Sequence, residues 1–177
     1  MEKIEFKNST YYFNQGKLYD DAYFEVSKNE SDVVLNYYFE NYNYQDLEEA
    51  EFIKFVKNVK LAGFYEACLK FIKYGLGKFT SSIEYYKTVF PIITSCYRAL
   101  NQSQKAIDFW MENKKLYVSC LSAALLTSLA AAYCDVKNYE LAKKCADRAY
   151  YMQGGGQGYK NELSLVYKRI EKETKED

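Results

Sequence analysis

The most regular pattern of apolar and polar positions lies in residues 123–154. Apolar side chains first recur three and four positions apart, and so share one helix face, at Leu126, Leu129, Ala130 and Tyr133. After turn-prone polar residues at 135–138, helical spacing resumes with Leu141, Ala142, Cys145, Ala146 and Ala149. Alanine lets two helix backbones approach closely, so this stretch predicts two antiparallel helices, the second ended by the glycines that begin at Gly154.

Two earlier stretches repeat this pattern more weakly. One carries Phe90, Ile93, Thr94 and Tyr97, followed by Ala106 and Trp110; the other carries Phe52, Phe55, Val56 and Val59, followed by Cys68 and Ile72. The same nine-residue step leads from Val59 to Cys68, from Tyr97 to Ala106 and from Tyr133 to Ala142. These echoes predict three helix pairs within residues 46–154.

The stretch at 123–154 resembles a tetratricopeptide repeat, in which an aromatic residue, Leu-Gly and Tyr are followed by Ala, Phe and a late Pro. The matching residues are Leu126, Leu129, Ala130, Tyr133, Ala142, Ala146, Ala149 and Gly154. Leu replaces the first aromatic residue, Ala replaces Gly and Phe, and Gly replaces Pro. The resemblance implies a short α-solenoid of stacked antiparallel pairs. In that family the first helices line a concave groove that commonly receives an extended peptide or a partner's helix.

The ends of the chain are expected to be helical too, which makes the predicted fold all-α and a single domain over residues 1–177. Helices are predicted over 2–15 and 17–28, separated by Gly16, and a third over about 32–43 with Ser31 or Asp32 as its N-cap. Residues 1–45 are acidic and rich in tyrosine. They form an atypical N-terminal unit, as the end units of solenoids often are.

Two further elements are expected around the helix pairs. Residues 157–174 place Leu163, Val166, Tyr167 and Ile170 on one stripe opposite charged residues, which predicts a C-terminal capping helix. Pro91 lies inside the apolar pattern of the second pair, and predicts a kink or break near residues 88–90.

Composition narrows the class of protein. Twenty tyrosines, eleven phenylalanines and no histidine are typical of an AT-rich genome, and the five cysteines show no metal-ligand spacing. With no signal-peptide pattern and no run of about 18 apolar residues, a cytoplasmic protein without a membrane partner is expected. Residues 1–48 hold ten acids and four bases, whereas residues 49–177 hold fourteen acids and twenty bases. The neutral total disfavours nucleic acid as a partner.

No catalytic constellation is visible, so we expect a protein that is not an enzyme and has no metal or cofactor. Histidine, the commonest general base, is absent, and no cysteine has an activating neighbour. The sequence GGGQGYK at 154–160 superficially suggests a phosphate loop. It lacks both the GK[ST] ending and a preceding strand, so a turn between helices is the preferred interpretation.

Carrying the repeat frame over places six residues near the groove: Lys57, Lys60, Ser95, Arg98, Thr127 and Asp135. Lys57, Lys60 and Arg98 could together bind a carboxylate or phosphate. The alternative is that they are ordinary solvated charges on helix surfaces. The asparagines that the family uses to bind a peptide carboxylate have no counterpart here.

Three functions fit these features. The leading hypothesis is a non-enzymatic scaffold that binds a protein or peptide in its groove. The second is a receptor or sequestering protein for a nucleotide or signalling peptide, and the third is a self-associating structural subunit, such as a homodimer. The acidic segment around Asp32–Asp46 could pack on a basic surface of its own chain or of a second copy, or could simply be an end unit with an acidic outer face.

Overall fold

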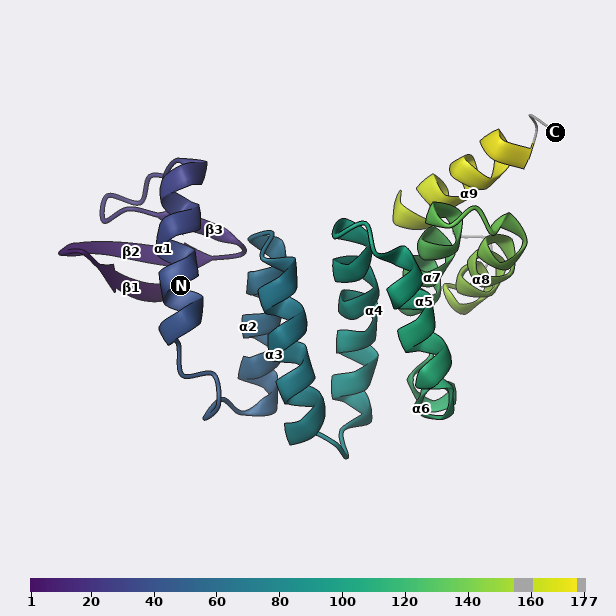
Figure 1. Cartoon of the computed structure of the whole chain (residues 1–177), viewed down its shortest axis with the longest axis horizontal. Helices are drawn as coiled ribbons and strands as arrows, with labels where there is room; N and C mark the ends of the chain where they lie inside the picture. The colour runs from purple at the N-terminus through teal and green to yellow at the C-terminus, as the bar shows by residue number, and fades with distance from the viewer. Residues whose placement is uncertain (155–160, 175–177) are drawn as a thin grey trace. The chain divides into compact units, whose positions relative to one another are not determined.

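The chain is mostly helical, with a small sheet at its N-terminal end. A computed structural model describes residues 1–154 and 161–174, which form three strands and nine helices (Figure 1). Residues 155–160 of the GGGQGYK stretch at 154–160, and the first residues of the predicted capping segment, lie outside the described residues. The chain divides into two compact units, unit 1 (Met1–Lys78) and unit 2 (Phe79–Asp177). The single domain over residues 1–177 stays a prediction.

Unit 1 begins with a three-stranded antiparallel sheet in the order β1 (Glu2–Phe6), β2 (Ser9–Asn14) and β3 (Lys17–Tyr19). Two-residue turns join the strands, and both central residues of each turn have positive φ: 47° and 66° at Lys7 and Asn8, and 49° and 81° at Gln15 and Gly16. Turns of this kind match the twist of a hairpin. The helices predicted over 2–15 and 17–28, and with them the all-α class in this region, are therefore wrong.

One face of the sheet is buried. Ile4 pairs with Tyr11 and Phe13 pairs with Leu18, and all four side chains are buried. The period-two alternation was hidden in the sequence because Tyr12 and Tyr19, on the opposite face, also read as apolar.

Helix α1 (Lys28–Asn41) packs on the sheet through aromatic and hydroxyl contacts. The rings of Phe13 and Phe39 meet edge to face with their centroids 5.8 Å apart. The Tyr38 hydroxyl donates to Glu2 at 2.6 Å, and the Tyr11 hydroxyl donates to Glu30 at 2.8 Å. The N-cap is Ser27, whose side chain accepts from the Glu30 backbone N–H. The predicted cap at Ser31 or Asp32 is wrong by about one helical turn.

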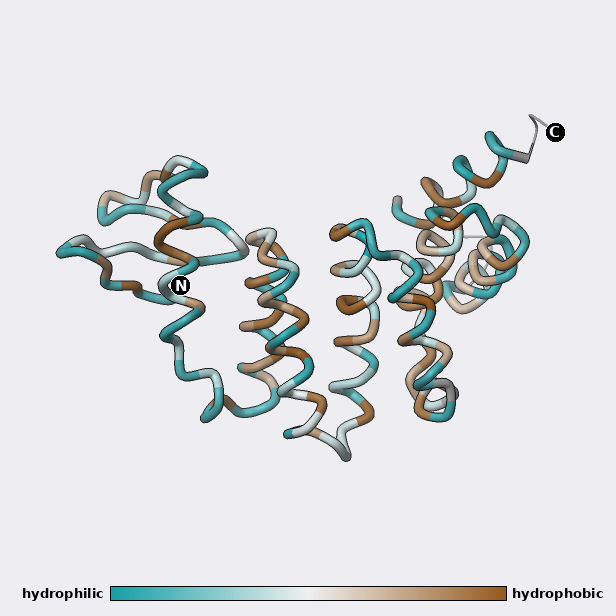
Figure 2. Tube along the Cα trace, in the orientation of Figure 1, coloured by the Kyte–Doolittle hydropathy of each residue, from teal (hydrophilic) through white to brown (hydrophobic). Residues whose placement is uncertain are grey.

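The first predicted pair is present as α2 (Glu49–Leu61) and α3 (Tyr65–Lys78). Gly63, with φ of 87°, lies in the turn between them, as expected for a helix end. Their core is aromatic: Phe55 stacks with Tyr42 at 4.9 Å between centroids and meets Phe71 at the same distance. In Figure 2 hydrophobic and hydrophilic positions alternate along these helices, as one-sided burial requires.

Unit 2 is helical throughout its described residues. Its elements are α4 (Ile83–Ala99), α5 (Ser103–Glu112), α6 (Lys114–Cys120), α7 (Ala123–Asp135), α8 (Tyr139–Met152) and α9 (Asn161–Thr174). Helix α7 lies at the centre and packs against α4, α5, α8 and α9. Nine of its thirteen residues are buried, as expected for a helix that is apolar on all sides.

Most helices predicted in this unit are confirmed. Ala142, Ala146 and Ala149 are fully buried in one cluster with Tyr133. In the predicted stripe of the last helix, Leu163, Val166 and Ile170 are buried, and Tyr167 is partly buried. Helix α4 continues through Pro91, so the predicted break is absent. Helix α6, inserted between the second and third pairs, was not predicted.

Gly16 generates the first prediction. A methyl group at this position would lie 2.5 Å from the backbone carbon of Leu61, and φ is 81°. Gly16→Ala should therefore destabilise the protein by about 2–4 kcal/mol, since it adds a steric clash to the cost of a left-handed backbone. Urea unfolding followed by circular dichroism measures the change.

Two glycines serve as controls, because neither has an atom within 4 Å of the added methyl group. Gly63→Ala carries only the backbone cost, about 1–2 kcal/mol. Gly77→Ala, inside α3, should stabilise the helix by about 0.5–1 kcal/mol. If Gly16→Ala were no worse than Gly63→Ala, the close approach of the β2–β3 turn to α2 would be wrong.

Ala142 generates the second prediction. Its methyl group is fully buried where α8 packs on α7. Ala142→Leu should cost about 1–3 kcal/mol through overpacking. The single tryptophan, Trp110, lies in unit 2 and reports the unfolding of this unit by fluorescence. Lys143→Leu adds the same side chain at an exposed position of α8 and should change stability by less than about 0.5 kcal/mol. Equal effects of the two substitutions would contradict the close packing.

Candidate functional site

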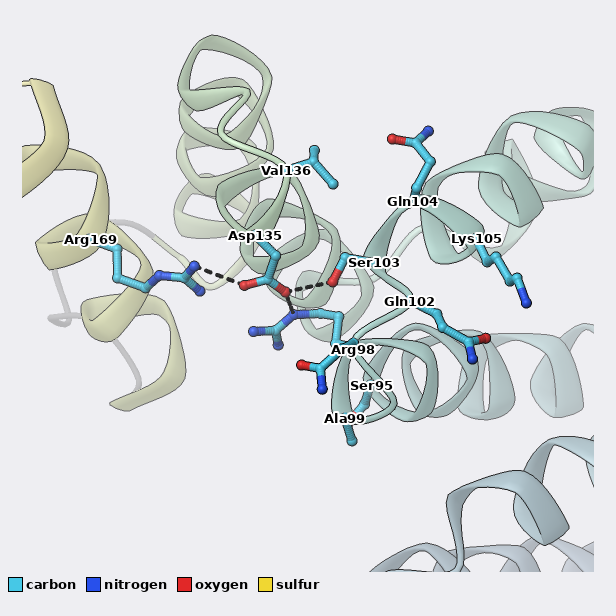
Figure 3. A pocket seen from close by; sticks show the side chains of 11 residues that line it. Ser95, Arg98, Ala99, Gln102, Ser103, Gln104, Lys105, Asp135, Val136 and Arg169 are labelled. Atoms are coloured by element: carbon cyan, nitrogen blue, oxygen red, sulfur yellow. Dashed lines mark hydrogen bonds and ion pairs between the residues drawn. The ribbon is translucent and has the colours of Figure 1, made fainter.

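Four helices of unit 2 bring polar side chains together, three of them at a helix end. The last turn of α4 supplies Arg98, the start of α5 supplies Ser103, and α7 ends at Asp135. Helix α9 runs past this point and supplies Arg169 (Figure 3). The short turns after α4 and α7 place these termini side by side, so residues far apart in sequence form one cluster.

Asp135 is the centre of the cluster. Its Oδ2 atom accepts hydrogen bonds from Arg98 Nε at 2.7 Å and from Ser103 Oγ at 2.8 Å. Its Oδ1 atom accepts from Arg169 Nη2 at 2.8 Å. The Asp135 side chain is only 26% exposed, so these charge-assisted bonds are partly shielded from water. One carboxylate therefore links α7 to α4, α5 and α9.

These contacts set the ionisation of Asp135. Partial burial alone would raise the pKa of the carboxyl group, since it disfavours the charged form. The hydrogen bonds from Arg98, Ser103 and Arg169 favour the carboxylate and outweigh burial, so the pKa lies below its ordinary value. Asp135 is an anion at neutral pH, and both arginines are held by it.

An open pocket of about 850 Å³ lies beside this cluster. Four charged residues line it: Arg98, Lys105, Asp135 and Arg169. The uncharged polar residues of the lining are Ser95, Asn101, Gln102, Ser103 and Gln104, and its apolar residues are Ala99 and Val136. With three cations and one anion, the lining carries a formal excess of two positive charges. Its chemistry suits a polar, negatively charged ligand.

Three of the six predicted groove residues, Ser95, Arg98 and Asp135, line this pocket together. Thr127 does not line the pocket: it is 8% exposed, and its hydroxyl donates to the Ala123 carbonyl at 2.8 Å inside α7. Lys57 and Lys60 lie on α2 in unit 1, with Lys57 exposed. The joint anion site of these lysines with Arg98 stays a prediction.

The sequence analysis missed other pocket residues, above all Arg169 and Lys105. Arg169 is one of the charged residues that the sequence pattern places opposite the apolar stripe of the last helix. It follows Val166 by three positions and therefore borders the apolar stripe, which was the available signal. Nothing in the sequence pattern indicated that Ser103 and Lys105 would meet residues of the third pair.

Other kinds of site find little support in the described residues. Burial raises the pKa of the Cys145 thiol to about 11 and also raises the pKa of Cys134, so these thiols are poor nucleophiles at neutral pH. In the part of the chain that the structure describes, no three Cys, Asp or Glu side chains gather as metal ligands would. Within the same residues, each helix is too short or too polar to cross a bilayer.

The Asp135 cluster generates the third prediction. The pKa of Asp135 in the folded protein is lower than its ordinary value of 3.8. The Asp135 carboxylate therefore stabilises the fold above pH 3.8, and this stabilisation is lost as the pH falls through the pKa of the folded state. Asp135→Asn should therefore lower the free energy of unfolding on the order of 1–2 kcal/mol at pH 7 and by a smaller amount near pH 3. Tryptophan fluorescence in urea at both pH values measures the difference.

Asp108→Asn is the matched control. Asp108 lies on the exposed side of α5 and, among the described residues, accepts a hydrogen bond only from the neutral Gln104 amide, at 2.9 Å. Its substitution should change stability by less than about 0.5 kcal/mol at either pH. A loss from Asp135→Asn that is equal at pH 7 and pH 3 would show that the ion pairs do not stabilise the fold.

Comparison of the chain with models of known protein families, with curated proteins and with solved structures finds no match.

Proposed function

We propose that the chain is a non-catalytic binding scaffold, and that the pocket beside Asp135 receives a segment of a protein or peptide partner. The observation that carries the proposal is the pocket itself. It combines a volume of about 850 Å³ with nine polar or charged residues among its eleven lining residues. Such a lining offers many hydrogen-bond donors and acceptors to a partner segment.

The scaffold is proposed to be a short solenoid of antiparallel helix pairs, as the resemblance to tetratricopeptide repeats implies. Support comes from the three consecutive pairs α2–α3, α4–α5 and α7–α8, each joined by a short turn. The second-helix positions Cys68, Ala106 and Ala142 are all buried, at no more than 1% exposure. A repeated packing position of this kind is what a stacked repeat needs.

A peptide segment fits the lining better than a drug-like molecule does. Small-molecule sites are predominantly apolar, with a few polar groups. Here the side-chain amides of Asn101, Gln102 and Gln104 provide both donors and acceptors, which an extended peptide backbone can use. The excess of positive charge favours a segment that carries acidic groups.

The second candidate is a receptor for a small anionic ligand. The volume of the pocket lies within the range of about 300–1,000 Å³ found for ligand sites. The clustering of Arg98 and Arg169 around one point favours a compact anion over a long segment. Both candidates use the same pocket and differ in what carries the negative charge.

The fourth prediction concerns the effect of a pocket substitution on partner binding, measured by affinity capture from the native cell. Lys105 lines the pocket and is exposed, and it is not among the hydrogen-bond and ion-pair partners of Asp135. Lys105→Glu reverses a charge at the pocket and should cost about 1.4 kcal/mol of binding free energy. This loss corresponds to about a tenfold lower capture of the partner. Quantitative mass spectrometry of the captured proteins and small molecules measures the loss.

Lys143→Glu, an exposed reversal on α8 outside the pocket, is the matched control and should leave the captured set unchanged. Circular dichroism shows that both variants are folded. Equal capture by the wild type and Lys105→Glu, or equal loss by the two variants, would contradict a partner site in this pocket.

A further inference from the structure

The two arginines that hold Asp135 keep most of their donors available. Arg98 uses only Nε and Arg169 uses only Nη2 in their bonds to the carboxylate. The two Nη groups of Arg98, and Nε and Nη1 of Arg169, make no other hydrogen bond or ion pair with the described residues. Both side chains also line the pocket, and they are 29% and 43% exposed.

We propose that the pocket binds a phosphate monoester between the guanidinium groups of Arg98 and Arg169, beside the carboxylate of Asp135. This phosphate site rests on the proposed function, since it specifies the chemistry of the ligand that the same pocket binds. Figure 3 shows the two guanidinium groups converging on Asp135 from α4 and α9. Guanidinium presents paired N–H donors that match the oxygens of a phosphate.

Asp135 prepares this site for an anion. Ion pairs at 2.7 and 2.8 Å fix the direction of both guanidinium groups before any ligand arrives. The entropy of ordering two long side chains is thus already lost in the free protein, which reduces the cost of binding. Asp135 is a positioning residue, and the donors that it leaves unused are those for the ligand.

The charge of the lining distinguishes a phosphate from a carboxylate. Arg98, Lys105 and Arg169 exceed Asp135 by two positive charges. A phosphate monoester carries a charge of about −1.5 to −2 at pH 7 and so neutralises this excess. A carboxylate, with one negative charge, leaves one cation unbalanced. A phosphate also offers three terminal oxygens, enough for both arginines at once.

The start of α5 adds further hydrogen-bond donors beside the two arginines. Ser103 and Gln104, the first two residues of this helix, line the same pocket as the arginines. Backbone N–H groups in the first turn of a helix have no partner within the helix and favour an anion nearby. Lys105 extends the positive lining along α5, as expected for a ligand larger than a lone phosphate.

A bound phosphate would join α4 to α9 by a second bridge. Arg98 belongs to α4 and Arg169 to α9, and at present Asp135 is the acceptor that connects them. A ligand that binds both arginines therefore stabilises the docked position of α9. Amide hydrogen exchange in α9 should slow on binding, because exchange there requires α9 to open.

The fifth prediction is tested by calorimetric titration of the full chain with defined probes. These are a phosphoserine pentapeptide, the same peptide with serine, the same peptide with glutamate, and adenosine monophosphate. At least one phosphorylated probe should bind in a 1:1 ratio, about tenfold or more tighter than the serine and glutamate peptides. Tighter binding of the peptide than of the nucleotide identifies a phosphorylated protein segment, and the reverse identifies a small phosphate ester.

Variants tie the binding to the arginines. Arg169→Gln should weaken the phosphorylated probe about tenfold or more, and Arg169→Lys should weaken it clearly, because it keeps the charge but loses the paired donors. Lys143→Gln, outside the pocket, should change the affinity less than about twofold. Circular dichroism verifies folding, and Lys105→Gln replaces the first variant if Arg169→Gln fails to fold.

Several results would overturn the phosphate site. They are a lack of saturable binding by both phosphorylated probes, equal affinity for the phosphoserine and glutamate peptides, and equal weakening by Arg169→Gln and Lys143→Gln. If cell partners still bind in a manner sensitive to Lys105→Glu while the phosphorylated probes do not bind, the scaffold stands and only the phosphate inference falls.

Discussion

A carboxylate at the C-terminal end of a helix is unfavourable by itself, because it adds to the negative end of the helix dipole. In unit 2, the hydrogen bonds that compensate one such carboxylate, that of Asp135, also hold four helices together. Asp135 is the last residue of α7, at the end of the helix where the helix dipole already places partial negative charge. Three donors from three other helices compensate this charge: Arg98, Ser103 and Arg169. Arg98 itself lies at the C-terminal end of α4, where a cation is favoured. The polar cluster therefore has a structural role in addition to the binding role that we propose.

This constraint explains why the helices of unit 2 meet as they do. Helix α7 is apolar on nearly every side, so it must be covered by α4, α5, α8 and α9. Apolar packing is non-directional and would tolerate helices that slide along α7. The bonds at Asp135 are directional, and they fix the end of α4, the start of α5 and the Arg169 position within α9 against it. Where α8 packs on α7, the fully buried alanines of α8 have small side chains, so the two helix backbones lie close together.

The sequence predicted those parts of the fold where one local pattern decided the outcome. The spacing of Ala142, Ala146 and Ala149 indicated a buried face, and all three are fully buried. The N-terminal strands were missed because tyrosine contributes an apolar ring to both faces of the sheet, which hides the alternation. The decisive local signal was the pair of turns at Asn8 and Gly16, where positive φ is tolerated.

The candidate site was predictable only in part, for a different reason. Ser95, Arg98 and Asp135 followed from the repeat frame, because each lies on the first helix of a pair. Arg169 and Ser103 reach the site through tertiary packing, and no spacing within their own helices points to Asp135. Thr127 has the polar type expected of a groove residue, but its hydroxyl bonds to the carbonyl of Ala123 one turn earlier. A polar residue inside an apolar helix can satisfy itself locally in this way.

The acidic surplus of the N-terminal region has an internal role that the sequence did not indicate. Glu2 and Glu30 accept hydrogen bonds from Tyr38 and Tyr11, and these bonds join the sheet to α1. Burial, followed by the contact with Glu2, raises the pKa of Tyr38, so its hydroxyl stays protonated and continues to donate. Both carboxylates therefore already accept a hydrogen bond from a tyrosine of unit 1. A contact of this region with a basic surface must depend on its other acids, such as those of the segment Asp32–Asp46.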